Sequence, residues 1–231
     1  AHGNTAVGYT ALTADTEGNY STAIGYATLA AQNFTTNTTV HNVAVGYASG
    51  NDITTGQHNT LLGSGTGAKL TDTDFNTALG STALNDDTLG GRSTAVGYAA
   101  LHTQNFTTAT DSYNVGVGYN AGNQVTTGIK NTLLGSLAGD ALTDSDNNVA
   151  VGAQALSSDT LGTRTVAVGY AALENQNFTT STNNYNVAVG YHAGNDITTG
   201  AQNTIVGGIA GDALTDADYN TAVGNRALGS D

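Results

Sequence analysis

A five-residue phrase recurs along the chain: a polar residue, Thr or Val, a small or apolar residue, an aliphatic residue and Gly. Its first copy spans residues 4–8 (Asn-Thr-Ala-Val-Gly) and its last spans 220–224, with the same five residues. Side chains alternate between the two faces of a strand, so the Thr and the aliphatic residue share one face and the small residue occupies the other. Each phrase therefore predicts a short β-strand that ends at a glycine, where the chain turns sharply.

The glycines that close the phrase define its period. There are thirteen of them: Gly8, Gly25, Gly46, Gly63, Gly80, Gly97, Gly118, Gly135, Gly152, Gly169, Gly190, Gly207 and Gly224. The steps in numbering between them run 17, 21, 17 and 17, three times over, so Gly8, Gly80, Gly152 and Gly224 mark a 72-residue repeat. We expect a single repeat domain over residues 1–231, excised from a longer fibre, with units of about 8–79, 80–151 and 152–223 and partial rungs at its ends.

Each period corresponds to one rung, meaning one circuit of the chain around a solenoid. A 17-residue or 21-residue period is too short for a pair of helices. A second short segment follows each glycine, as in 9–12 and 98–101, before a turn rich in Asp, Asn, Thr and Gly. Two strands and two turns per rung predict an all-β fold, a parallel β-roll or β-solenoid of about 13 rungs. At ~4.8 Å per rung it would form a rod on the order of 60 Å long.

The small position of the phrase is usually Ala, and large apolar residues are few. A slim solenoid of this composition buries little apolar surface alone. We therefore expect the small face to pack against other copies of the chain, so that a bulky residue at Ala95 or Ala167 would disrupt assembly. The Asn that opens most copies has two interpretations: a ladder of hydrogen-bonded amides between rungs, or a cap on its own turn.

The composition removes several function classes. Charged residues make up 10% of the chain, and 5 Lys+Arg against 18 Asp+Glu give a formal net charge of −13. Such a surface repels nucleic-acid phosphates and anionic membranes. No apolar run approaches the ~20 residues of a membrane-spanning helix. We expect no nucleic-acid partner and no direct membrane insertion, and the lack of Cys excludes disulfides and thiolate metal sites.

The phrase Asn-Thr-Ala-Val-Gly-Tyr-x-Ala-Leu, with variants over 93–101 and 165–173, resembles the YadA-like head repeats of trimeric autotransporter adhesins and related repeats of bacteriophage tail fibres. The resemblance covers essentially the whole chain. It implies a left-handed β-roll, a parallel homotrimer and adhesion to a cell-surface glycan or protein receptor. The rungs are longer than those of the adhesin heads, and Tyr often follows the Gly. A virion tail fibre and an adhesin of the bacterial cell surface therefore both stay open.

No catalytic constellation recurs in the repeats. No histidine position recurs in all three units, although the chain has five histidines. The glycine-rich stretch 63–69 lacks the spacing of a phosphate-binding loop. Paired acids do recur, in Leu-Thr-Asp-x-Asp turns: Asp72, Asp74, Asp144, Asp146, Asp216 and Asp218. Oxygen-rich turns bind calcium, but Asp in a turn is also an ordinary backbone cap. We expect a non-enzymatic protein without a cofactor, with calcium as an alternative ligand of these pairs.

The 21-residue rung has four more residues than its neighbours, and the surplus is predicted to bulge from the solenoid. Each such rung carries a Gln-Asn-Phe motif: Gln32, Asn33, Phe34, Gln104, Asn105, Phe106, Gln176, Asn177 and Phe178. One interpretation is receptor binding, with each phenylalanine stacked on a sugar ring. The other is structural: each phenylalanine folds back over its own rung, and the tyrosines that follow the glycines form a stacked ladder.

These patterns predict a fibrous, trimeric spacer and receptor-binding segment that mediates attachment to a cell surface. An ice-binding solenoid is an alternative, because flat solenoid faces with regularly aligned threonines can bind ice. The face-forming position alternates Thr with Val, as at Thr22 and Val43, so no unbroken outward Thr-x-Thr file forms. A calcium-stabilised structural repeat domain is a further alternative.

Overall fold

The computed structural model describes residues 1–229, and none of these residues is helical. They form two compact units, residues 1–114 and residues 115 onward. Within each unit, strands one rung apart pair in parallel, as Thr5 does with Thr22 and Val149 with Val166. The predicted all-β parallel solenoid is confirmed, whereas its handedness, the number of chains and the single-domain organisation stay predictions.

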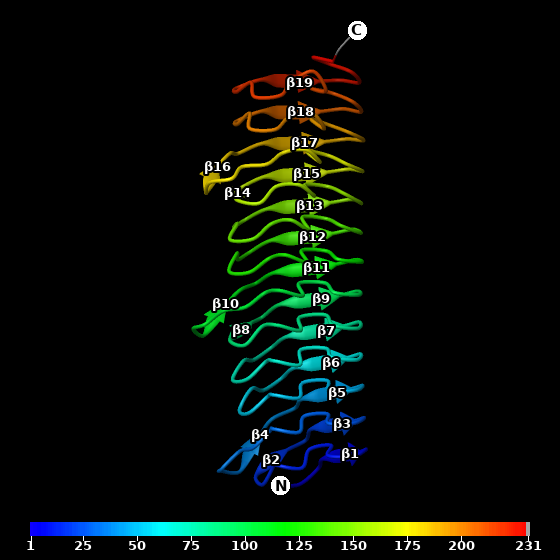
Figure 1. Cartoon of the computed structure of the whole chain (residues 1–231), viewed down its shortest axis with the longest axis vertical. Coiled ribbons are helices and arrows are strands. Elements are labelled where there is room, and N and C mark those ends of the chain that lie inside the picture. Colours follow the sequence, from blue (N-terminus) through cyan, green and yellow to red (C-terminus); the bar gives the residue numbers. More distant parts are fainter. Residues whose placement is uncertain (230–231) are drawn as a thin grey trace. The chain divides into compact units, whose positions relative to one another are not determined.

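Each phrase forms a strand of three residues. In the first unit these strands are β1 (Thr5–Val7), β3 (Thr22–Ile24), β5 (Val43–Val45), β6 (Thr60–Leu62), β7 (Thr77–Leu79) and β9 (Thr94–Val96) (Figure 1). In the second unit they are β11 (Val115–Val117), β12 (Thr132–Leu134), β13 (Val149–Val151), β15 (Val166–Val168), β17 (Val187–Val189), β18 (Thr204–Val206) and β19 (Thr221–Val223).

The core of each unit lies between this sheet and the segments that follow the glycines. The small positions of the strands, including Ala44, Ala95 and Ala167, are completely buried inside a single chain. They pack in the same core as fully buried leucines and isoleucines, such as Leu29 and Ile53. The expectation that the small face packs against other copies is therefore wrong. A bulky residue at Ala95 or Ala167 would instead overpack the chain's own core.

The segments after the glycines are turns, so the predicted second strand of each rung is also wrong. In residues 9–12, Thr10 and Leu12 have φ of +55° and +53°, and Ala27 and Leu29 repeat this pattern one rung later. The left-handed residues send alternate N–H groups to the two neighbouring rungs: Ala27 donates to the Tyr9 carbonyl at 2.9 Å, and Leu29 donates to the Ser49 carbonyl at 3.1 Å.

Close approach of the next rung's backbone requires glycine at the end of most of these strands. Gly46 has φ of +135°, and a Cβ there would lie 2.2 Å from the carbonyl oxygen of Gly63 in the next rung. No side chain fits at that separation, and L-residues avoid this backbone conformation.

The asparagines that open the phrases link one rung to the next. Asn59 Oδ1 accepts the Asn76 N–H at 2.9 Å, and Asn59 Nδ2 donates to the Thr73 carbonyl at 2.7 Å. Asn148 does the same for Thr165 and Gly162. A ladder between rungs therefore forms, but most of its bonds join side-chain amides to backbone groups rather than amide to amide.

Candidate functional site

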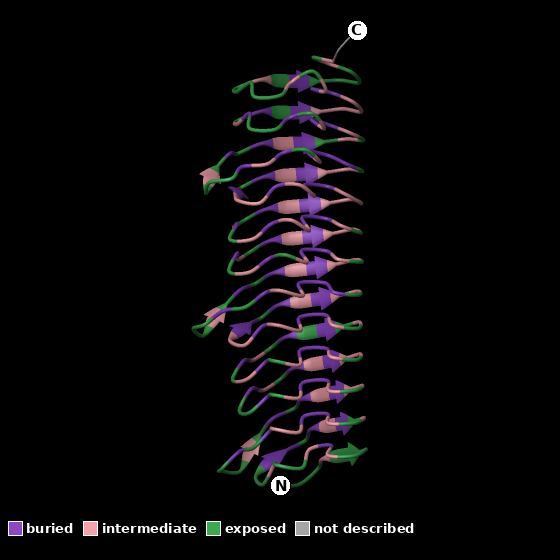
Figure 2. Ribbon diagram, in the orientation of Figure 1, coloured by how far each residue is buried: buried purple, intermediate pink, exposed green. Residues whose placement is uncertain are grey.

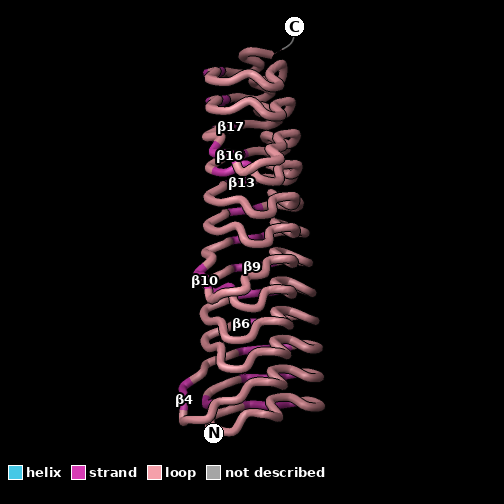
Figure 3. The backbone as a smooth tube through the Cα atoms, turned by 60° about the vertical axis from the view of Figure 1, so that its left-hand side comes forward, coloured by secondary structure: helices cyan, strands magenta, loops and turns pink. Residues whose placement is uncertain are grey.

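Each 21-residue rung sends out an arm, defined here as residues 35–39, 107–111 or 179–183. A short strand in each arm pairs in parallel with a strand at the preceding turn. The pairs are β2 (Gly18–Asn19) with β4 (Thr38–Thr39), β8 (Gly90–Gly91) with β10 (Thr110–Asp111), and β14 (Gly162–Thr163) with β16 (Thr182–Asn183). Figure 3 shows these arms beside the stacked rungs of their units. Most arm residues are exposed, as the predicted bulge requires.

A buried carboxylate anchors the long rung of the second repeat. Asp87 Oδ1 accepts the backbone N–H groups of Gly90 at 2.9 Å and Phe106 at 3.3 Å. Its Oδ2 accepts the amide of Gln104 at 2.5 Å, and Gln104 Oε1 accepts the amide of Asn114 at 2.8 Å. Burial raises the pKa of Asp87, and these hydrogen bonds partly oppose that rise.

The same network occurs in the other two long rungs. Asp15 accepts Gln32 at 2.7 Å, and Asp159 accepts Gln176 at 2.6 Å. Burial also raises the pKa of Asp159. The long rungs themselves open with Ser21, Ser93 and Thr165, whose side chains lack the amide that elsewhere bridges to the next rung. The glutamine takes over this bridging role, which explains its recurrence in a structural way.

Sequence reasoning missed these aspartates. A signal was present, because Asp15, Asp87 and Asp159 recur at the same place in each repeat and each opens an Asp-Thr turn with Gly at its fourth position. Two of the donors to Asp87 lie 17 and 19 residues further along the chain, so its role as an acceptor appears only when the long rung is folded beside it.

The predicted receptor-binding residues divide between the core and the surface. Phe34, Phe106 and Phe178 are 6%, 5% and 7% exposed, and Gln32, Gln104 and Gln176 are completely buried. This burial favours the structural interpretation, in which each phenylalanine covers its own rung. Asn33 and Asn105 are exposed and Asn177 is half-buried. Of each predicted trio, only the asparagine therefore faces solvent at the base of the arm.

The paired acids cap the turn of the preceding rung. Asp72 Oδ1 accepts the Thr55 hydroxyl at 2.5 Å, and Asp74 Oδ1 accepts the Gln57 N–H at 2.7 Å. Asp144 and Asp146 repeat these bonds with Thr127 and Ile129. Asp218 Oδ1 accepts the Ala201 N–H at 2.7 Å, whereas Asp216 accepts only its neighbour Thr215 at 3.3 Å. Among residues 1–229, no three His, Cys, Asp or Glu side chains gather closely enough to hold a metal ion.

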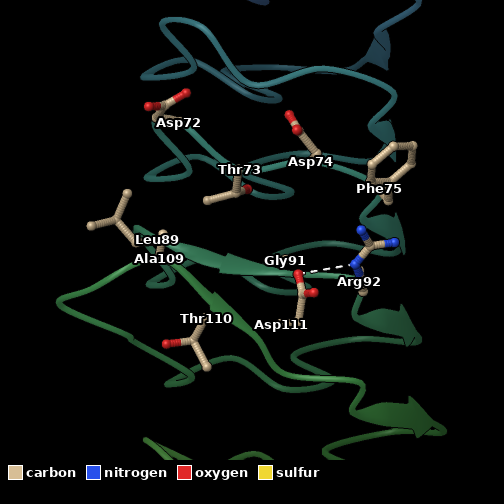
Figure 4. A pocket seen from close by; sticks show the side chains of 10 residues that line it. All are labelled: Asp72, Thr73, Asp74, Phe75, Leu89, Gly91, Arg92, Ala109, Thr110 and Asp111. Atoms are coloured by element: carbon tan, nitrogen blue, oxygen red, sulfur yellow. Dashed lines mark ion pairs between the residues drawn. The ribbon is translucent and has the colours of Figure 1, made fainter.

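A groove of about 340 Å³ lies between the second arm and the acidic turn at Asp72 and Asp74 (Figure 4). Arg92 crosses it, donating from Nε to Asp111 Oδ1 at 2.9 Å while its guanidinium lies 4.8 Å from the centre of the Phe75 ring. The remaining lining is Thr73, Leu89, Gly91, Ala109 and Thr110. The groove offers carboxylate and hydroxyl groups beside a small apolar floor.

The outward face of the sheet carries an aliphatic residue in every rung. In the first unit these are Val7, Ile24, Val45, Leu62, Leu79 and Val96, and in the second unit Val117, Leu134, Val151, Val168, Val189, Val206 and Val223. All are exposed or half-buried in the single chain, and each shares its face with a Thr or Val at the start of the strand (Figure 2). We call this surface the outward sheet face.

Stacked side chains border the outward sheet face. Beyond the strand ends, Tyr9, Tyr26 and Tyr47 stack with ring centres 5.3 Å apart, and Tyr170 and Tyr191 stack at 5.6 Å. These stacks form part of the tyrosine ladder of the structural interpretation. Before the strands, a second column follows the first unit at left-handed positions: Tyr20, His41, His58, Phe75 and Arg92.

Comparison with protein-family models, curated proteins and solved structures found no match. Within the part of the chain that the structure describes, no helix is both long and apolar enough to span a bilayer.

Proposed function

We propose that this chain is a non-enzymatic segment of a fibre in which three parallel copies associate through the outward sheet face. The fibre belongs to a phage virion or to a bacterial cell surface, spaces its attachment points and presents the arms to a cell-surface receptor. The single observation that carries this proposal is the outward sheet face, which leaves one aliphatic side chain exposed or half-buried in every rung. The number three comes from the resemblance of the repeat to trimeric adhesin heads.

The physical argument for association is the continuity of this face within each unit. Scattered apolar residues are normal on a protein surface, but contiguous files of Val, Leu and Ile mark interaction surfaces. Burying each of them against a second chain removes apolar area from water, worth about 25 cal/mol per Å². The flat, in-register strands repeat the same contact in each rung, so a second copy of the chain is the partner of matching shape and period.

The arms are the proposed attachment points. Their exposed residues are mainly threonines and other small polar residues, and the groove at Asp72, Asp74 and Asp111 lies directly beside one of them. Hydroxyl and carboxylate groups of this kind bond sugar hydroxyls, so a surface glycan is the receptor class we favour. Each chain has three arms, and three chains would combine weak contacts by avidity.

Attachment is tested by placing Arg at Thr36, Thr108 and Thr180 together, one exposed residue in each arm. A matched control places Arg at Asp52, Gln124 and Asp196, which are exposed and also stand at one equivalent position of each repeat. Binding is measured on an array of bacterial and mammalian surface glycans. Loss of binding in the arm variant alone supports the proposal. Equal binding of both variants, or no binding by the unsubstituted chain, counts against it.

Ice binding is the second candidate, because Thr60, Thr77 and Thr94 stand in register on three successive strands of the outward sheet face. Thermal hysteresis of the purified chain separates the two functions. A measurable difference between the melting and freezing temperatures of ice in the protein solution would favour ice binding over assembly, since both functions need the same face.

A further inference from the structure

The base of each arm carries the tripeptide Asn-Phe-Thr, at 33–35, 105–107 and 177–179. The pattern Asn-x-Ser/Thr is the acceptor motif for N-linked glycosylation, and it is used on surface loops. Each repeat holds one of the three copies, at the start of its most exposed segment.

The asparagine side chains are oriented in the same way in all three repeats. Their Oδ1 atoms accept the hydroxyls of Thr16, Thr88 and Thr160 at 3.1, 2.9 and 3.0 Å. Within residues 1–229, their Nδ2 atoms form no hydrogen bond. The acceptor oxygen is thus held by the fold while the nitrogen that would carry a sugar is left unengaged.

Among the residues described, the hydroxyl of the motif's third residue forms no contact that stabilises the fold. Thr35, Thr107 and Thr179 are exposed, and their side-chain oxygens make no hydrogen bond within the described part of the chain. Many residue types would fit there, yet all three repeats have Thr. A transferase that reads the hydroxyl would account for this choice.

Another copy of the motif shows what an unsuitable site looks like. Asn19 opens Asn-Tyr-Ser but is 1% exposed, and its Nδ2 donates to Asn37 Oδ1 at 2.5 Å and to the Thr38 carbonyl at 3.1 Å. A sugar on this nitrogen would break the pairing of β2 with β4. The fold therefore distinguishes motifs at which a sugar is compatible with the folded chain from motifs at which it is not.

We propose that Asn33, Asn105 and Asn177 are acceptor sites for N-linked glycans. The donor is a sugar activated by a diphosphate, on either a lipid or a nucleoside, and a glycosyltransferase catalyses the transfer. Asn Nδ2 forms a bond to the anomeric carbon and loses one proton to an enzyme base. The bond from that carbon to the diphosphate oxygen breaks, and the diphosphate leaves.

Transfer must precede folding of the long rung. The middle residue of each motif is a buried phenylalanine, and the Phe178 N–H donates to Asp159 Oδ1 at 3.0 Å. A transferase needs the tripeptide extended in its cleft, which the folded rung does not permit. Chain that is already folded should therefore be a poor acceptor, although a sugar added earlier would lie in solvent.

For the test, the full chain is expressed in two systems that supply different sugar donors. The first is a eukaryotic secretory pathway, which uses a lipid-linked donor. The second is bacterial cytoplasm with a soluble transferase, which uses a nucleotide sugar. A further acceptor motif, Asn-Thr-Thr at 37–39, is removed from every variant by Thr39→Ala. A flexible Asn-Ala-Thr tag reports that each transferase is active. The matched control replaces Thr35, Thr107 and Thr179 with Val, which keeps the shape of the residue and removes the motif.

The expected result is glycan on Asn33, Asn105 and Asn177 under at least one donor, located by peptide mass spectrometry and lost in the Val variant. Purified folded chain should gain sugar on its tag but not at these sites. A glycosylated tag with all three asparagines bare under both donors would overturn the proposal. Folded chain that carries a glycan on Asn19 would overturn it as well, because the buried and hydrogen-bonded Nδ2 of Asn19 has no room for a sugar. The proposal does not depend on the function proposed above.

Discussion

Asp87 accepts hydrogen bonds from three residues and donates none, so its role depends on its being an acceptor at both oxygens. An amide in its place would keep one acceptor and turn a donor toward the Gln104 amide. We predict that Asp87→Asn lowers the free energy of unfolding by about 1–3 kcal/mol, the cost of an unsatisfied buried polar group.

Reversing the polarity of the partner should restore this loss. In the double variant Asp87→Asn with Gln104→Glu, the new amide donates to the new carboxylate, which also accepts the Asn114 amide. Urea unfolding of both single variants and the double variant completes the cycle. Additive losses in the double variant would show that the two side chains do not act as a pair, and Asp52→Asn serves as the exposed control.

Asp140 gives a prediction with a pH dependence. Its Oδ1 is buried and has no hydrogen-bond partner among residues 1–229, and burial raises the pKa of its carboxyl from 3.8 to about 6. The folded state then binds the proton more tightly than the unfolded state, so this group's contribution to stability falls as pH rises from about 4 to about 6. Asp140→Asn removes the charge, and solvent screening of this half-buried group limits the gain to about 1 kcal/mol.

The measurement is the melting temperature of Asp140→Asn against the unsubstituted chain. At pH 8 the variant should melt higher, and the difference should shrink toward pH 4, where the wild-type carboxyl is protonated. A difference that does not change with pH, or a variant that melts lower at pH 8, would contradict the burial argument.

At the scale of the element, the strand and its closing glycine are the unit that repeats. Gly63 has φ of +141°, and a Cβ there would lie 2.5 Å from the Gly80 carbonyl oxygen. Gly65, two residues later, has φ of +64° with its nearest neighbour atom at 3.3 Å. Thr82 occupies the equivalent position one rung on, at φ of +55°.

We predict that Gly63→Ala and Gly65→Ala differ widely in effect. Gly65→Ala should cost about 1–2 kcal/mol, the usual penalty of a left-handed L-residue. Gly63→Ala should cost several times as much, because the backbone of two rungs must separate. Equal melting temperatures of the two variants would mean that the rungs are not held at this spacing.

The acidic turns give a prediction about metal. Asp72 and Asp74 already accept hydrogen bonds from the preceding rung, so they act as caps without an ion. We expect the same melting temperature in excess calcium and in chelator. Asp74→Asn should lower the free energy of unfolding by about 1 kcal/mol, because it removes a cap. A large upward shift with calcium would revive the metal interpretation of these pairs.

The short strands and their register could be predicted because the phrase alternates strictly and recurs in step with the solenoid. The inward direction of the small face could not, since alternation separates two faces without saying which one the chain encloses. The left-handed turns were also beyond prediction, because residues such as Thr10 and Leu29 carry no local signal for positive φ. The burial of Phe106 depends on Asp87 and Gly90, which precede it by most of a rung.

At the scale of the whole molecule, Leu61 and Leu62 are adjacent in β6 but belong to different surfaces. Leu61 is completely buried, whereas Leu62 lies on the outward sheet face. We predict that Leu62→Asp combined with Leu134→Asp separates the chains while leaving the far-ultraviolet circular dichroism unchanged. Leu61→Asp should instead unfold the rung, since it buries a charge in the core. Dissociation without unfolding distinguishes the two faces.

The most direct test of the proposed assembly is the molar mass of the unsubstituted chain in solution, measured by light scattering across a gel-filtration peak. One chain has a mass of 23.1 kDa. Association of three chains through the outward sheet face predicts a single species of three times that mass, unchanged on dilution and reduced to one chain by the two outward Asp substitutions. A folded, soluble species of 23.1 kDa would contradict the account, because the outward sheet face would then be stable in water without a partner.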